Sequence, residues 1–359
     1  MARKRSATRS VIDSLGRSWC VADPDEPPFV VGSLEAAELA HISYRLASEH
    51  DAAKEIDDHE LLVNAEVAIR QASSDLAASL IHFRLLGSRD GIMLLRGLPI
   101  DHPVPRTPPG GCFTRSWREL TVSTISQLMI MSVLGDVISY ADEKGGQLIQ
   151  DICPVPGAER RQENTGCTLL ELHTEDGFHP NKPDFLSLLA LRSDHGKQAI
   201  TVASGIRVVL PRLEPEVVQV LYQPWYRIKL ASSFVGTRVT AFSRPNPVLS
   251  GCPSDPDLCV DFHGIEPLND VARQALEELR HHILGSLVGV VLEPGDMLIV
   301  DNRKAVHGRT DFSPRYDGHD RWLRRCFAVA DIRRSQPMRY RSSRVHRPLH
   351  ASAEHDGHE

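Results

Sequence analysis

The sequence predicts an α+β fold in which helices pack on a mainly antiparallel β-sandwich or barrel. Up to about residue 138, apolar residues recur at helical spacing. After Gly145 they gather in short runs rich in β-forming residues and bounded by turn residues. Helices followed by strands in this order fit helices wrapped on layered antiparallel sheets.

Four segments are expected to be helical. Residues 33–46 carry apolar side chains at helical spacing behind Ser33, a favourable N-cap. Residues 61–86 and 118–138 show the same spacing over longer stretches. Residues 273–287 form a further helix that interrupts the strand region.

Strands are expected at residues 186–191, 206–210 and 297–300, the last of them after a Pro-Gly turn. The basic residues 1–15 and the His- and Ser-rich residues 341–359 lack apolar periodicity, so we expect both ends to be disordered. The four histidines within residues 341–359 are not assigned a metal-binding role. Residues 16–340 are then one domain, with its sheet core from about residue 90.

Composition narrows the class of partner. The chain has 359 residues, 41% of them hydrophobic, a formal net charge of −6 and no apolar run near the roughly 18 residues that span a bilayer. We therefore expect a cytoplasmic protein that binds a small molecule, with no nucleic acid and no membrane as partner. Seven cysteines without a C-x-x-C pair indicate reduced thiols rather than disulfides or a zinc ribbon.

Two short segments offer metal ligands. His173 and Glu175 are two residues apart, so on a strand they share one face. This spacing alone is weak, because 17 histidines and 47 acidic residues predict about two such pairs by chance. A turn, a strand and then His307 bring one imidazole from a distant segment. Two nitrogens and one carboxylate suit iron(II) and its oxygen chemistry.

Two arginines follow the second metal segment. Arg321 and Arg325 lie four residues apart, so on a strand both point to one face while Arg324 points to the other. A guanidinium pairs bidentately with a carboxylate. Two such groups beside a metal indicate a substrate or co-substrate with carboxylates. Asn302 and Arg309 are expected to orient His307, because metal-binding histidines usually have such a partner.

Several segments together resemble one known family. They are GDVISY (135–140), QD (150–151), HTEDGF (173–178), DNRKAVHGR (301–309) and PRYDGHDRWLRR (314–325). In these segments the chain resembles the clavaminate synthase-like branch of the Fe(II)/2-oxoglutarate oxygenases, which includes hydroxylases of free arginine, asparagine and lysine. The resemblance covers residues 135–334 and implies a double-stranded β-helix (jelly-roll, cupin-like) core with flanking helices.

The resemblance also implies a role for each candidate residue. His173, Glu175 and His307 would bind iron, with 2-oxoglutarate and O2 as co-substrates. Arg321, with Thr201, would hold the distal carboxylate of 2-oxoglutarate. The substrate residues would be Arg325 on the α-carboxylate, Glu143 on the α-ammonium, Asn164, and Asp261 toward the side chain.

The substrate side chain stays open. Arginine-processing relatives tend to carry Asp-x-Asp where this chain has Asp261, Phe262 and His263, so the second anion for a guanidinium is missing. A single carboxylate suits an ammonium, a guanidinium or an amide. The expected reaction is hydroxylation of a polar or basic L-amino acid at Cβ or Cγ, with release of succinate and CO2. Desaturation, a zinc hydrolase with the same ligands, and an inactive amino-acid sensor are the alternatives; the hydrolase leaves Arg321 and Arg325 unused.

Overall fold

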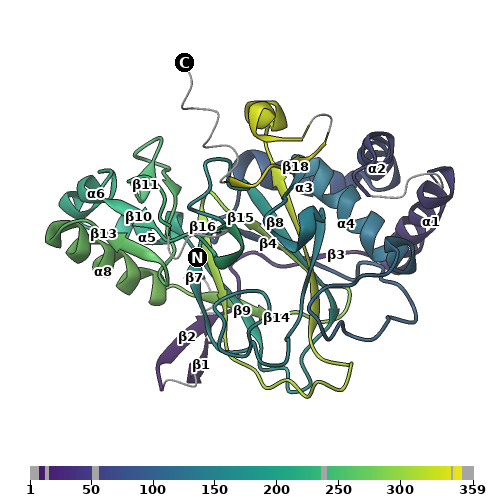
Figure 1. The fold of residues 1–359 in the computed structure, drawn as a ribbon, viewed down its shortest axis with the longest axis horizontal. Helices are drawn as coiled ribbons and strands as arrows, with labels where there is room; N and C mark the ends of the chain where they lie inside the picture. The colour runs from purple at the N-terminus through teal and green to yellow at the C-terminus, as the bar shows by residue number, and fades with distance from the viewer. Residues whose placement is uncertain (1–7, 13–15, 51–55, 236–240, 341–342, 350–359) are drawn as a thin grey trace, which may run out of the picture.

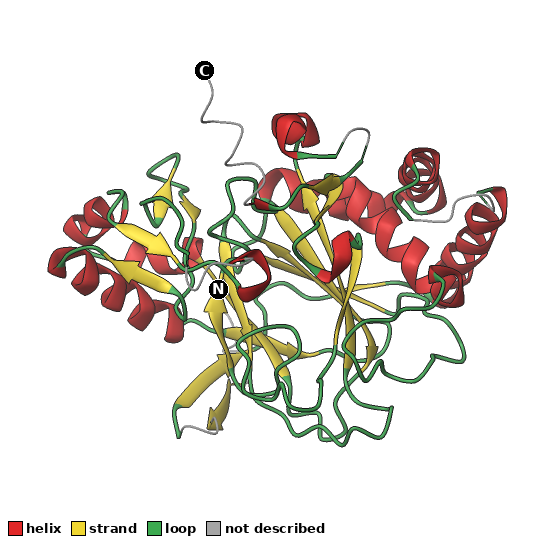
Figure 2. Cartoon of the chain, viewed as in Figure 1, coloured by secondary structure: helices red, strands yellow, loops and turns green. Residues whose placement is uncertain are grey.

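The computed structural model describes residues 8–12, 16–50, 56–235, 241–340 and 343–349. In this part of the chain, helices flank two curled sheets on opposite sides (Figures 1 and 2). Apolar side chains from both sheets, such as Leu188, Phe327, Val290 and Ala203, share one core cluster. The sheets therefore pack face to face, as expected for a layered sheet protein.

The larger sheet has eight strands. Their order is β18 (Val345–His346), β5 (Asp136–Tyr140), β17 (Trp322–Val329), β8 (Phe185–Arg192), β15 (Met297–Asp301), β4 (Ile92–Arg96) and β3 (Phe29–Val30), and β6 (Ile149–Ile152) also pairs with β17. Most of these pairs are antiparallel, but the two edge strands β18 and β3 pair in parallel with their neighbours. The long central strands β8 and β17 are almost entirely buried.

The second sheet has six strands. Their order is β1 (Thr8–Ile12), β2 (Ser18–Ala22), β14 (Val288–Val291), β9 (Ile200–Gly205), β16 (Ala305–Arg309) and β7 (Leu170–His173). Two small two-stranded sheets accompany it, formed by β10 (Tyr226–Ile228) with β13 (Ile265–Pro267) and by β11 (Leu249–Ser250) with β12 (Asp257–Leu258). The edge strand β7 carries the first candidate ligand.

The helices form two groups. The first group packs on the outer face of the larger sheet and consists of α1 (Ser33–Glu49), α2 (His59–Ala72), α3 (Ser74–Leu86) and α4 (Thr121–Leu134). Helix α4 is buried on nearly every side, which explains its apolar sequence. The second group, α6 (Pro215–Leu221) and α8 (Asp270–Leu284), packs on the smaller sheet (Figure 1). Two short helices, α5 (Ile206–Val209) and α7 (Ser232–Val235), complete the fold with four short 3-10 turns.

The helix predictions are confirmed in position but not in length. Residues 61–86 form two helices, because Ser73 takes an extended conformation and its hydroxyl caps the second helix by accepting the Leu76 N–H (3.2 Å). Residues 118–138 are helical only to Leu134. A Cβ on Gly135 would lie 2.4 Å from the Val329 carbonyl oxygen, so glycine lets the chain approach β17 there and begin β5.

The strand predicted at 206–210 is wrong. The strand in this region is β9, which ends at Gly205, and residues 206–209 form helix α5. Ile206 and Val209 are buried together, whereas the two residues between them are only partly buried. A spacing of three places both on one helical face, and this contact outweighs the β-preference of the individual residues.

Disorder at both ends is also wrong for the residues that can be described. Residues 8–12 form β1, which pairs with β2 along its whole length. His346, in β18, is fully buried and pairs with Tyr140. The other residues of these two ends for which disorder was predicted, 1–7, 13–15, 341–342 and 350–359, lie outside the described residues.

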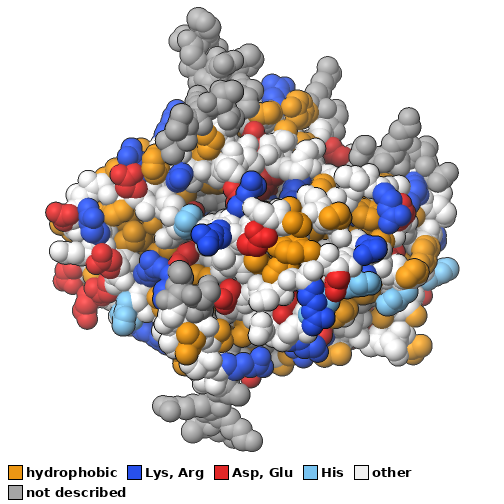
Figure 3. Space-filling view, turned by 60° about the horizontal axis from the view of Figure 1, so that its bottom comes forward, with side chains coloured by type: hydrophobic (Ala, Val, Ile, Leu, Met, Phe, Trp, Pro, Cys, Tyr) orange, Lys and Arg blue, Asp and Glu red, His pale blue; other side chains and the backbone are white. Residues whose placement is uncertain are grey.

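Three further expectations can be compared with the structure. None of the helices that the structure describes is long and apolar enough to cross a membrane. The seven cysteines are free thiols, as predicted. On the face seen in Figure 3, basic and acidic side chains are interspersed rather than separated into fields of one sign.

Candidate metal centre and substrate pocket

Three side chains, on or directly after two neighbouring strands, converge at the edge of the smaller sheet. His173 ends β7 and is the register partner of His307 in β16, and Glu175 follows two residues later. The two imidazole rings have centroids 4.4 Å apart, and Glu175 Oε2 lies 3.4 Å from His307 Nε2. One donor atom from each residue lies within 4.8 Å of the others. The set offers two nitrogens and one carboxylate to one ion, which fits iron(II).

Backbone contacts orient these donors. His173 Nδ1 lies 2.8 Å from the Glu171 carbonyl oxygen, which directs its Nε2 toward the other two side chains. The Asn302 side chain accepts the Glu175 N–H (2.7 Å) and donates to the Glu175 carbonyl (3.0 Å). Asn302 therefore holds Glu175 in place.

The expectation that Asn302 and Arg309 orient His307 is wrong. The Asn302 side chain hydrogen-bonds to Glu175 and to the Pro183 carbonyl rather than to His307. Arg309 donates to the carbonyls of Gly166 and Thr168. His307 Nδ1 is buried without a hydrogen-bond partner among the described residues. Its position in the middle of β16, paired on both sides, orients the ring instead.

The charge states suit metal binding. Burial opposes ionisation of Glu175, but Arg325 and the two histidines hold its pKa well below the ordinary value. Burial and the nearby His173 lower the pKa of His307. An ionised carboxylate and a neutral imidazole are the forms that bind a metal.

Arg321 is a buried cation without an ion-pair partner among the described residues. It precedes β17, is 5% exposed, and its Nη2 donates to Thr201 Oγ1 (3.3 Å). No carboxylate of the described residues lies within ion-pair distance of its guanidinium. Burial, followed by the neighbouring Arg309, lowers the pKa of Arg321 to about 9. The structure thus brings together the two residues proposed from sequence for one carboxylate, and leaves them ready to accept an anion.

Arg325 connects the metal ligands to the pocket. Its Nη1 donates to Glu175 Oε1 (2.7 Å) and its Nη2 to Glu143 Oε2 (2.7 Å). Nη1 also lies 3.3 Å from Asn164 Oδ1, and Nε lies 3.2 Å from Gln150 Oε1. Glu143 and Asn164 therefore meet Arg325, as the sequence analysis expects of one substrate-binding group. Gln150 belongs to the motif at 150–151, but the sequence analysis did not predict a function for it.

Arg324 points away from this cluster, as the strand alternation predicts. Its Nη1 donates to Thr124 of α4 (2.6 Å), on the opposite side of β17. Strand β8 absorbs a register shift opposite Trp322 and Leu323. The alternation along β17 itself is preserved, so the side chains of Arg324 and Arg325 lie on opposite faces.

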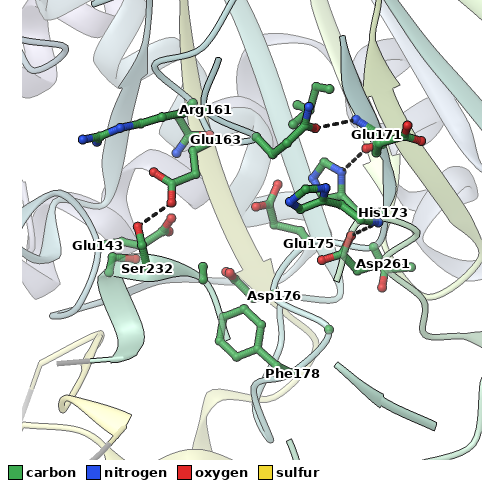
Figure 4. A pocket seen from close by; sticks show the side chains of 18 of the residues that line it. Glu143, Arg161, Glu163, Glu171, His173, Glu175, Asp176, Phe178, Ser232 and Asp261 are labelled. Atoms are coloured by element: carbon green, nitrogen blue, oxygen red, sulfur yellow. Dashed lines mark hydrogen bonds between the residues drawn. The ribbon is translucent and has the colours of Figure 1, made fainter. Parts of the chain in front are cut away.

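A cavity of about 340 Å³ opens beside the metal-binding side chains (Figure 4). Asp261 lines this cavity, and its backbone forms an isolated β-bridge with His173. Its Oδ1 accepts the His263 N–H (2.9 Å). Most of the lining is polar or charged, and it includes Glu143, Asn164, Glu175, Asp176, Asp261 and Arg325. The cavity therefore suits a small charged or polar ligand.

Asp176 is a pocket residue that sequence reasoning missed. It is 7% exposed and has a left-handed backbone (φ 47°), and its Oδ2 has no hydrogen-bond partner in the described part of the chain. Burial, followed by Glu143 and Glu175, raises its pKa well above the ordinary value. The available signals were its place directly after Glu175 and its membership of the HTEDGF segment, to which no role for Asp176 was attached.

The comparisons with known proteins agree with this geometry. Residues 135–327 match the family model described as taurine catabolism dioxygenase TauD, TfdA family. The chain is 41% identical to L-asparagine oxygenase of Streptomyces coelicolor over 306 residues, which cover 85% of this chain and 90% of that protein. It is 34% identical to clavaminate synthase 2 of Streptomyces clavuligerus over 289 residues, with 80% and 88% covered.

A solved structure extends the likeness to three dimensions. Asparagine oxygenase in complex with Fe(II), 2S,3S-3-hydroxyasparagine and succinate has a TM-score of 0.84 and 39% identity, covering 90% of this chain and 99% of that one. The relatives are oxygenases, so the zinc-hydrolase alternative falls away. The cofactor of this protein is iron(II), and its co-substrates are 2-oxoglutarate and O2. The chain belongs to the TauD/TfdA dioxygenase family, within its clavaminate synthase-like group of iron(II)- and 2-oxoglutarate-dependent amino-acid oxygenases.

Proposed function

We propose that this protein hydroxylates free L-asparagine at Cβ. In the overall reaction one oxygen atom of O2 enters the hydroxyl group of the product. The other enters succinate, which forms with CO2 from 2-oxoglutarate. The reaction class follows from the family, and the choice of asparagine rests on the relatives and on Asp261.

We assign iron(II) to His173, Glu175 and His307. Bound iron(II) supplies, with 2-oxoglutarate and O2, the oxidising power needed to break an unactivated C–H bond. The protein's own part is to hold the donors in their metal-binding charge states and to place one C–H bond beside them. The contact from Arg325 to Glu175 Oε1 supports this, because it fixes one oxygen of the carboxylate and leaves Oε2 facing His307.

We assign the distal carboxylate of 2-oxoglutarate to Arg321 and Thr201. A guanidinium and a hydroxyl side by side offer the donors that a carboxylate accepts. Burial of Arg321 strengthens its interaction with a carboxylate, because the surrounding dielectric is low. Arg321 also has no ion-pair partner among the described residues, so the ligand displaces no protein carboxylate.

The α-amino and α-carboxylate groups of the substrate fit the ion pair between Glu143 and Arg325. Arg325 Nη2 donates to Glu143 Oε2 at 2.7 Å, so the two side chains mark one place for a positive group and one for a negative group. A bound zwitterion would insert between them, with its ammonium on Glu143 and its carboxylate on Arg325. Asn164, which contacts the same guanidinium, would help to fix this end of the substrate.

Asp261 supports the choice of an amide side chain over a guanidinium. Its carboxylate lines the cavity, and its Oδ1 accepts the His263 N–H. One acceptor matches the NH2 group of a side-chain amide. The guanidinium of arginine has five N–H donors, and no second acid follows at residue 263.

The deciding experiment incubates iron-loaded protein with 2-oxoglutarate and, separately, asparagine, lysine, ornithine, arginine and aspartate. We expect succinate release and a product heavier by one oxygen atom with asparagine, detected by mass spectrometry. Turnover of a basic amino acid in its place would refute the choice of substrate. Loss of two hydrogens would identify desaturation, and tight binding without turnover under O2 would identify a sensor.

We further propose that the two-sheet core is a double-stranded β-helix and that residues 16–340 act as one domain. The shared core cluster between the sheets and the family membership support this assignment. A cytoplasmic location is supported by seven free thiols, which are usual in a reducing compartment.

A further inference from the structure

Asp176 combines two unfavourable features at one position. An aspartate at φ 47° lies in the left-handed region that non-glycine residues rarely adopt. Its Oδ2 is also buried without a partner among the described residues. A strained backbone and an unsatisfied buried polar atom each destabilise the folded protein. Such a combination at a cavity wall indicates that the missing partner is a ligand.

The charges around Asp176 define the kind of ligand. Three carboxylates, Glu143, Glu175 and Asp176, lie close enough to interact electrostatically, and the cation Arg325 acts on all three. The donors of Arg325 are directed at Glu143, Glu175, Gln150 and Asn164. Asp176 is therefore left without a donor, and a cationic N–H group is the ligand that completes the set.

The position of Asp176 identifies which end of the substrate it meets. Asp176 interacts electrostatically with Glu143 and Arg325, the pair assigned above to the amino-acid zwitterion. In Figure 4 its carboxylate lies among the side chains of Glu143, Glu175 and Phe178, whereas Asp261 lies on the far side beside His173. The two acids thus serve different ends of one ligand.

We propose that Asp176 is a second carboxylate for the α-ammonium of the substrate and makes the enzyme selective for amino acids over their desamino analogues. Glu143 and Asp176 accept separate N–H groups of the same ammonium. Aspartate suits the position because a short polar side chain tolerates the left-handed conformation better than a larger one. The proposal rests on the proposed function, since it requires an amino-acid substrate.

The test compares two ligands that differ only at the α-carbon, L-asparagine and its desamino analogue succinamic acid. Their equilibrium binding to enzyme loaded with iron(II) and 2-oxoglutarate is measured by calorimetry without O2. The variant Asp176→Asn keeps the size of the side chain and its tolerance for φ 47°. We expect it to lose at least about tenfold in affinity for asparagine and to bind succinamic acid almost as the unchanged enzyme does.

Two further variants serve as controls, one for the side-chain end of the substrate and one for folding. Asp261→Asn should weaken both ligands to a similar extent, because both carry the side-chain amide. Asp176→Gly removes the carboxylate and accepts φ 47°, so it replaces Asp176→Asn if that variant does not fold. The absorbance of the iron(II)–2-oxoglutarate complex shows whether a variant retains its metal centre.

Unchanged asparagine affinity in Asp176→Asn, or an equal loss for both ligands, would overturn the proposal. Failure of the proposed function has a different signature, since the unchanged enzyme would then not bind asparagine at all. If another amino acid proves to be the substrate, the same pair of measurements uses that amino acid and its desamino acid.

Discussion

Replacing Arg321 by methionine should change stability and co-substrate affinity in opposite directions. Burial lowers the pKa of Arg321 from 12.5 to about 9, which corresponds to an upper limit of about 5 kcal/mol against the folded, charged form. A methionine of similar length removes that charge and loses the contact with Thr201. Replacing a buried ion pair by apolar side chains is often neutral or stabilising by about 1–4 kcal/mol. Arg321 lacks an ion-pair partner among the described residues, so we expect a gain in this range without ligand.

The same change should nearly abolish binding of 2-oxoglutarate. Removing one partner of a buried charge pair costs about 2–5 kcal/mol, which corresponds to a dissociation constant raised about 30- to 5,000-fold. Urea unfolding without ligand measures the first effect. An anaerobic titration of the iron(II) enzyme with 2-oxoglutarate, followed by its visible absorbance, measures the second.

Arg324→Met is the matched control for this experiment. Arg324 is equally buried, but it donates to Thr124 and lies 3.7 Å from Asp151. Its loss should destabilise the protein and leave the titration with 2-oxoglutarate unchanged. A destabilised Arg321→Met protein with normal 2-oxoglutarate affinity would refute the assignment of Arg321.

Other variants test the remaining parts of the site. His307→Ala should abolish iron-dependent succinate release, and residual release above the metal-free background would contradict the ligand assignment. Arg325→Ala should spare 2-oxoglutarate binding and weaken the amino acid at least about tenfold, as seen by calorimetry; an equal defect for both ligands would count against the division between the two arginines. Acid should destabilise the fold through His179 and His346, because burial lowers their pKa values to about 3 and about 4. Their stabilising effect is complete above pH 6.5 and is lost as the pH falls toward 4, by up to about 4 kcal/mol at pH 5 for the two together. Urea unfolding at pH 7 and pH 5 measures this loss, which His346→Phe should roughly halve.

The helical half of the fold could be predicted because its signals are local. Helices α1, α4 and α8 lie where the apolar spacing places them. The break at Ser73 and the turn at Gly135 depend on a cap and on a close approach to β17, which periodicity alone does not reveal. The strands at the chain ends were missed for a related reason. Residues 8–12 are mostly exposed, so backbone pairing rather than an apolar pattern defines β1.

The site was predictable where chemistry and strand alternation point to the same residues, and unpredictable where contacts cross between segments. The spacing alone predicted that Arg324 and Arg325 lie on opposite faces of a strand, as they do in β17. The contact of Asn302 with Glu175 joins residues 127 positions apart, so the sequence indicated a supporting residue but not which ligand it supports. Asp176 illustrates the same limit more sharply. An acid next to a metal ligand has no spacing that distinguishes it from a solvent-exposed side chain. Only its burial, its left-handed backbone and the lack of a hydrogen-bond partner for Oδ2 among the described residues single it out, and each of these features depends on the three-dimensional fold.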